Sequence, residues 1–112
     1  MWIYLTEGAL SIVAHRDKPD HLLVRARHPR VIERVFPKED MYYNSSADYP
    51  YRANVPREVV SDFLTTRLSL MQYDNFKNTV NDYDYSSLLK VVWNEGYIWG
   101  ENHRYNYIQD KE

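Results

Sequence analysis

The chain has 112 residues and a formal net charge of −2, with 14 Lys and Arg against 16 Asp and Glu. Its length suits one domain and excludes two independent cores. A composition of 44% apolar and 27% charged residues is typical of a folded, soluble protein and excludes wholesale disorder. The balanced charge excludes a histone-like polycation and a strongly acidic DNA mimic. The lack of cysteine in the sequence excludes disulfides, thiolate metal sites and a cysteine nucleophile.

The N-terminus lacks the basic start and apolar stretch of a signal peptide, and no apolar run is long enough to cross a membrane. We therefore expect a cytoplasmic protein without a membrane partner. Tyrosine is the compositional outlier, since it supplies 11 of the 17 aromatic residues. Because tyrosine packs with its ring and hydrogen-bonds with its hydroxyl, it is enriched at interfaces.

Short apolar runs separated by turn residues predict three strands near the N-terminus. Residues 2–5 and 9–14 flank residues 6–8, whose glycine favours a tight turn, so we predict a β-hairpin. A polar turn with Pro19 follows, and residues 21–27 alternate well enough to form a third strand.

The third strand is predicted to have one apolar and one basic face. Side chains alternate along a strand, so Leu22, Val24 and Ala26 turn toward the core. Arg25 and Arg27 then point to the opposite face of the sheet, which is predicted to be cationic.

A helix, a loop and a fourth strand are predicted next. The helix is short, because it begins in the turn that holds Pro29 and ends at Pro37. Residues 38–50 are polar and rich in turn formers, which predicts a loop, and residues 51–55 predict a strand.

The clearest helix of the sequence follows that strand and continues to about Met71. Asn54 is predicted to cap it, and Pro56 suits its first turn. Apolar residues at helical spacing give the helix a face for the core.

The remaining residues predict one or two helical turns over 75–82 and a last helix that begins at Asp84 or Ser86 and ends near Trp99. Residues 100–112 show no convincing period, which predicts a flexible tail after a single domain over residues 1–99. The element order is therefore β-β-β-α-β-α-α. This is an α+β fold in which a mainly antiparallel sheet of about four strands is covered on one face by helices.

Several segments of the chain form a recognisable pattern: residues 1–3, 11–20, 23–27, 48–52 and 73–77 together with Val92-Trp93. The first five read MWI, SIVAHRDKPD, LVRAR, DYPYR and YDNFK. This pattern resembles a family of small uncharacterised proteins encoded in bacterial and bacteriophage genomes, and the resemblance spans roughly residues 1 to 95. It implies an intracellular single-domain protein of bacterial or phage origin, and it singles out the polar positions 15–17, 25, 27, 49, 52 and 75–77.

No catalytic or metal-binding pattern is specific in this sequence. His15, Asp17, Asp20 and His21 have suitable ligand atoms, but their spacing matches no known metal site and is typical of a solvated turn. We predict no cofactor, no metal and no catalytic residue.

A small histidine-dependent hydrolase is a third hypothesis. His15 or His28 could act with Asp48 as a general acid or base, because imidazole titrates near neutrality. Nothing in the sequence places these groups within hydrogen-bond reach, and surface histidines are the simpler explanation of the pattern.

A second group of candidate residues is distinguished by its charge. Residues 15–34 hold six Lys and Arg against three Asp and Glu, whereas residues 56–112 hold six against nine. A basic sheet face with a neighbouring aromatic could bind single-stranded nucleic acid by charge and stacking. Alternatively, the arginines pair with Glu7, Glu33 or Asp48 and keep the sheet soluble. The residues of the nucleic-acid hypothesis are Arg16, Lys18, Arg25, Arg27 and Arg30.

A third group of candidate residues consists of tyrosines with neighbouring aspartates, in residues 42–51 and 73–85. Tyrosine offers a large contact area at low entropic cost, and aspartate complements a basic partner. Tyr49, Tyr51, Tyr73 and Phe76 are expected to complete a small core instead. The residues of the protein-binding hypothesis are Tyr42, Tyr43, Asp48, Tyr83, Asp84 and Tyr85.

The leading hypothesis from the sequence is a small non-enzymatic accessory factor that binds a host or phage protein. The resemblance adds the expectation that it is encoded by a phage or mobile element and modulates a host or defence protein. The alternative hypothesis is a nucleic-acid-associated module that uses the basic sheet face. Homo-oligomerisation is left open.

Overall fold

The computed structural model describes the backbone of residues 1–111 and the side chains of these residues except 105, 107, 108, 110 and 111. The chain forms two compact units, Met1–Asp74 and Asn75–Glu112. We call them the sheet unit and the helical unit and describe each by itself. The expected division was one domain over 1–99 with a tail.

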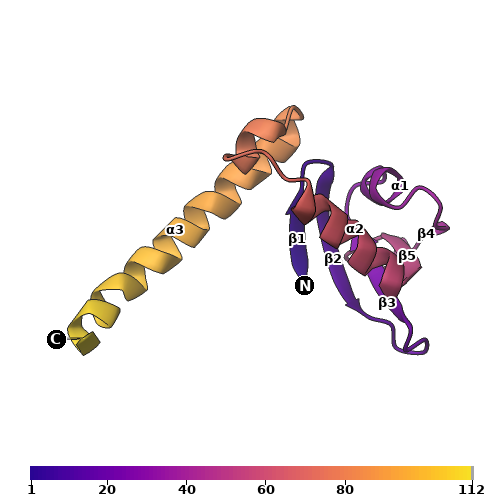
Figure 1. Ribbon diagram of the computed structural model, residues 1–112, viewed down its shortest axis with the longest axis horizontal. Helices are drawn as coiled ribbons and strands as arrows, with labels where there is room; N and C mark the ends of the chain where they lie inside the picture. The colour runs from indigo at the N-terminus through magenta and orange to yellow at the C-terminus, as the bar shows by residue number, and fades with distance from the viewer. Residues whose placement is uncertain (112) are drawn as a thin grey trace. The chain divides into compact units, whose positions relative to one another are not determined.

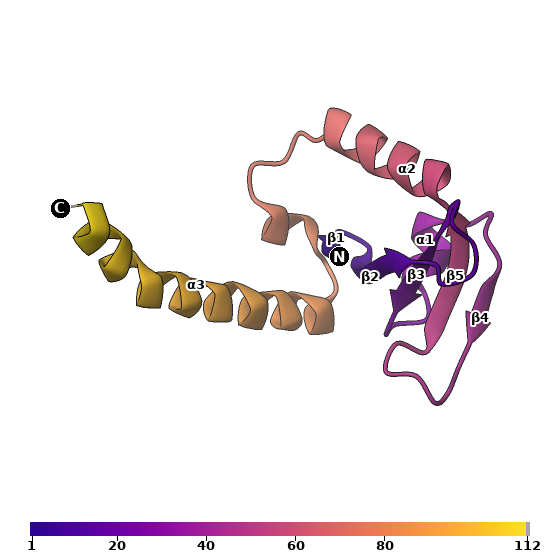
Figure 2. The ribbon, with the colours of Figure 1, turned by 90° about the horizontal axis from the view of Figure 1, so that it is seen from below.

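The sheet unit is built on a five-stranded antiparallel sheet in the order β1-β2-β3-β5-β4 (Figures 1 and 2). The strands are β1 (Trp2–Leu5), β2 (Gly8–Ala14), β3 (His21–Ala26), β4 (Met41–Tyr43) and β5 (Tyr51–Pro56). The α+β fold and the four predicted strands are confirmed. The fifth strand, β4, lies inside the run predicted as a loop and forms the edge of the sheet beside β5.

One face of the sheet carries the core. The strand pairing aligns Ile12, Val24, Ala53 and Met41 side by side across four strands, and the first three are buried. The predicted inward direction of residues 22, 24 and 26 is confirmed, because all three belong to or pack against this core.

Two helices cover the core face. The short helix α1 (Val31–Val35) buries Val31, Ile32 and Val35 against the sheet. The longer helix α2 (Arg57–Ser69) adds Val60 and packs on β3 and β5. The Phe36 and Phe63 rings join the two helices, with their centroids 5.3 Å apart.

The predicted cap of α2 is wrong. Asn54 lies within β5 and is paired with Leu23, and its side chain therefore projects from the sheet. The helix begins directly after the strand, with Pro56 at the cap position and no side-chain cap hydrogen bond. The fixed φ of proline allows the chain to pass from strand to helix without a separate turn.

The helical unit holds a 3₁₀ helix, η1 (Phe76–Thr79), and the long helix α3 (Tyr83–Lys111). The predicted turns over 75–82 are thus confirmed. The cap of α3 is Asp82, whose Oδ1 accepts the Tyr85 N–H at 2.8 Å, and not Asp84 or Ser86. The helix also continues beyond Trp99 to Lys111, within the segment expected to be a flexible tail.

Gly8 begins β2 beside α1, and two observations require glycine there. Its φ of 145° is in the region that favours glycine. A Cβ at this position would lie 2.5 Å from Cγ2 of Val31. We expect Gly8→Ala to lower the free energy of unfolding by about 2 to 4 kcal/mol, through backbone strain and overpacking. Urea denaturation followed by circular dichroism measures this change.

The matched control is Gly96→Ala in α3, where a Cβ meets nothing within 4 Å. Alanine favours a helix by about 1 kcal/mol over glycine, so this variant is expected to retain or gain helix stability. Equal losses in both variants would contradict the role assigned to Gly8.

Candidate functional site

A row of polar and aromatic side chains crosses the sheet face opposite the core. Each residue of the row is the direct partner of the next in the strand pairing, so their side chains share one face. From β1 to β4 the row is Trp2, Ser11, Arg25, Arg52 and Tyr42. We call this face the open face of the sheet unit.

Tyr49 organises the arginines at the middle of this row. It belongs to residues 44–50, which connect β4 to β5. Figure 2 shows this connection as a loop at one end of the two strands. The Cζ atoms of Arg25 and Arg27 lie 4.9 and 4.2 Å from the centroid of its ring. Arg52 Nε donates a hydrogen bond of 3.0 Å to the Tyr49 carbonyl oxygen.

We call these four residues the arginine–tyrosine cluster. Cation–π contacts of this type each contribute roughly 0.5 to 1 kcal/mol at exposed sites, enough to order a side chain. The prediction that Tyr49 completes the core is therefore wrong. Its ring instead holds guanidinium groups on the opposite face of the sheet.

The three arginines of the cluster are not neutralised by acidic side chains. Among the described residues, no Asp or Glu carboxylate oxygen lies within 4.0 Å of their nitrogens. Arg25 Nη2 donates to Ser11 Oγ at 2.7 Å, and Arg27 Nε makes a long contact of 3.4 Å with the Asp48 backbone oxygen. Both acceptors are neutral, so three positive charges remain.

The pairing that the sequence analysis offered as an alternative is therefore not made. The Asp48 carboxylate accepts the Tyr49 N–H at 2.9 Å, and Glu7 binds Arg67. In addition, Arg25 Nε is buried without a hydrogen-bond partner in the described part of the chain. A buried polar atom without a partner is uncommon in proteins.

The other residues of the nucleic-acid hypothesis lie apart from the cluster. Arg16 and Lys18 belong to the turn between β2 and β3, which is at the opposite end of β3 from Arg27. Arg30 is exposed at the beginning of α1, and its N–H donates to His28 Nδ1. Arg52 was not among the predicted site residues, although it belongs to the cluster.

The residues of the protein-binding hypothesis do not form one patch in the sheet unit. Tyr42 and Tyr43 are neighbours in β4 and so point to opposite faces of the sheet. The Tyr43 ring packs against Tyr51, with centroids 5.4 Å apart, whereas Tyr42 extends the row on the open face. Tyr83, Asp84 and Tyr85 form the first turn of α3 in the helical unit.

The histidines serve local turns. His15 Nδ1 accepts the backbone N–H groups of Asp17 and Lys18, each at 3.0 Å, and His28 Nδ1 accepts that of Arg30 at 3.2 Å. The His21 ring contacts Asp20 at 2.7 Å, and this hydrogen bond lowers the pKa of the exposed Asp20 carboxyl. Within the described residues, no three His, Asp or Glu side chains are grouped to hold a metal.

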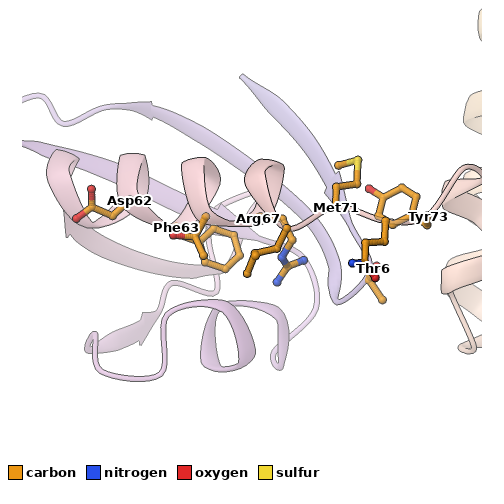
Figure 3. Close-up of a pocket in the computed structure, with 9 residues that line it drawn as sticks. Thr6, Asp62, Phe63, Arg67, Met71 and Tyr73 are labelled. Atoms are coloured by element: carbon orange, nitrogen blue, oxygen red, sulfur yellow. The ribbon is translucent and has the colours of Figure 1, made fainter.

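A shallow pocket lies at the end of α2 (Figure 3). Its lining includes Thr6, Asp62, Phe63, Arg67, Met71 and Tyr73. Arg67 donates two hydrogen bonds of 2.8 and 2.6 Å to the two Glu7 carboxylate oxygens. The charge of Arg67 is therefore already paired, unlike the charges of the arginine–tyrosine cluster.

No protein-family model, curated protein or solved structure matches the chain. The resemblance to small bacterial and phage proteins therefore stays a prediction. Four polar positions that it singles out, 25, 27, 49 and 52, come together in the arginine–tyrosine cluster. No helix of the described chain is both long and apolar enough to cross a membrane.

The Glu7–Arg67 pair ties the first hairpin to α2 and makes stability depend on pH. The hydrogen bonds from Arg67 lower the pKa of the Glu7 carboxyl below its ordinary value of 4.5. The stabilisation is therefore complete above pH 4.5 and is lost as the pH falls through the lower folded-state pKa. We expect Glu7→Gln to reduce the free energy of unfolding by about 1 to 2 kcal/mol at pH 7.

Denaturation of both proteins from pH 7 to pH 2 measures this difference, which should shrink below pH 4.5. Glu101→Gln is the control, because Glu101 pairs with Arg104 on the exposed surface of α3 and should contribute at most about 0.5 kcal/mol. A difference for Glu7→Gln that stays constant with pH would contradict the ion pair.

Proposed function

We propose that this protein binds nucleic acid through the open face of its sheet unit. The observation that carries the proposal is the set of three guanidinium groups of Arg25, Arg27 and Arg52, which gather around Tyr49 without a carboxylate partner. Uncompensated like charges destabilise a fold, so a cluster of this kind is expected where an anion binds.

The chemistry of the cluster suits phosphate. A guanidinium group offers a planar fork of N–H donors that matches two phosphate oxygens, and it stays charged at any physiological pH. Arg25 and Arg52 are direct partners on neighbouring strands, so their side chains leave the sheet next to each other on the open face. A sugar-phosphate backbone supplies anions at short intervals and can contact both.

The net charge of −2 does not oppose this function, because the contact depends on local charge. The negative charge of the sequence is concentrated in residues 56–112, whereas the open face carries the arginines. The range of electrostatic interactions in physiological salt is about 8 Å, so acidic residues farther away have little effect on the bound phosphates.

Protein binding is a second candidate, and the helical unit favours it. Several large apolar side chains of α3 are exposed, among them Val91, Ile98 and Trp99. Exposed apolar patches of this kind often contact other proteins. A phage origin and a host or defence protein as the target are further expectations that rest on the resemblance. A purified protein partner that binds the unmodified chain should no longer bind the Trp99→Ala variant and should still bind the Glu101→Ala variant.

We expect the full chain to bind a fluorescein-labelled oligonucleotide of eight thymidines at low salt. The double variant Arg25→Gln and Arg27→Gln should weaken binding by about 30-fold to 100-fold, because each charged contact contributes roughly 1 to 1.5 kcal/mol. With three phosphate contacts, the logarithm of the binding constant should fall with the logarithm of salt concentration at a slope of about −2. Fluorescence anisotropy measures both quantities.

The matched control removes two charges from the β2–β3 turn, in the double variant Arg16→Gln and Lys18→Gln. It should change affinity by less than about threefold, since these residues lie at the other end of β3. Circular dichroism verifies that each variant is folded. Absence of binding by the unmodified chain at low salt, or equal binding of a glutamate-rich peptide, would contradict the proposal.

A further inference from the structure

Both ends of the row on the open face are aromatic. The residue Trp2, in the edge strand β1, is 72% exposed, and Tyr42, in the edge strand β4, is 44% exposed. Neither ring is part of the core, since the core lies on the other face. Two exposed aromatic residues therefore flank the arginines on one surface.

The spacing of the row suits an extended chain of nucleotides. Trp2 and Tyr42 are separated by four strand-to-strand steps, which corresponds to about 19 Å across the sheet. Arg25 and Arg52 occupy consecutive positions between them. From β1 to β4 the row is thus aromatic, polar, cationic, cationic and aromatic, with Ser11 as the polar member, and it runs perpendicular to the strands.

Aromatic side chains have a specific use next to phosphate-binding groups. An unpaired base stacks on an exposed ring, and each such contact contributes about 1 to 3 kcal/mol with little regard to sequence. The bases of a duplex already stack on one another, and their faces are not accessible to a ring. Exposed aromatic side chains therefore favour single strands over duplexes, whereas arginine contacts alone bind both.

We infer that the ligand of the open face is a single-stranded nucleic acid of about four nucleotides in contact length, with bases stacked on Trp2 and Tyr42. Its phosphates lie against Arg25 and Arg52 between the two rings. This inference rests on the proposed function and adds the strandedness of the ligand and two stacking residues. Neither ring was assigned a nucleic-acid role from the sequence.

The test compares labelled single strands of two, four and eight thymidines with a 12-base-pair duplex. We expect a large gain in affinity from two to four nucleotides, and at least tenfold weaker binding of the duplex than of the eight-nucleotide strand. Trp2→Ala and Tyr42→Ala should each weaken single-strand binding at least fivefold. Trp2→Phe and Tyr42→Phe retain a ring and should restore most of the affinity.

Tyr43→Ala is the matched control, because Tyr43 is the same residue type in the same strand and points to the other face of the sheet. Trp99→Ala, in α3, is the control for loss of an exposed tryptophan. Both controls should bind as the unmodified chain does. Because Trp2 and Tyr42 are exposed, their variants should remain folded, which circular dichroism verifies.

Two results would overturn the inference and leave the proposed function in place. In the first, the protein binds duplex and single strand with equal affinity, and only the arginine variants lose binding, whereas the Trp2 and Tyr42 variants keep it. The other is a loss on Tyr43→Ala as large as that on Tyr42→Ala. Absence of binding to every oligonucleotide at low salt would instead overturn the proposed function itself.

Discussion

The antiparallel pairing of β3 with β5 decides what each face of the sheet can do. It places Val24 beside Ala53 on one face and Arg25 beside Arg52 on the other. A shift of one residue in this register would bury the arginines and expose the core, so hydrophobic burial specifies the register strongly. The pairing that closes the core therefore also brings the two arginines together.

Tyr49 and Ser11 make the arginine arrangement tolerable. The tyrosine ring contacts two guanidinium groups, and the buried serine hydroxyl accepts a hydrogen bond from Arg25. Neither residue neutralises a charge, so order is achieved without loss of the positive potential. This differs from Arg67, whose bidentate contact with Glu7 fixes an element of the fold and leaves no free charge.

Local patterns predicted much of the fold but little of the site. The first hairpin and the alternation in β3 were predictable because apolar and polar residues alternate over neighbouring positions. The strand β4 has only three residues in a polar run, so no period indicates it. Arg52 and Tyr49 join Arg25 through long-range pairing and a folded-back loop, and nothing in the sequence near them signals this. Trp2 likewise joins the row only through the pairing of β1 with β2 and of β2 with β3.

The adjacency of Arg25 and Arg52 has a consequence for stability. Like charges directly opposite one another on paired strands destabilise a sheet by a few tenths of a kcal/mol up to about 1 kcal/mol. The free protein thus carries a repulsion that the folded core must outweigh. An anion seated between the two guanidinium groups relieves it, and the relieved energy appears as affinity. For the proposed nucleic-acid ligand, fold stability and affinity are therefore set against each other at a single pair of residues.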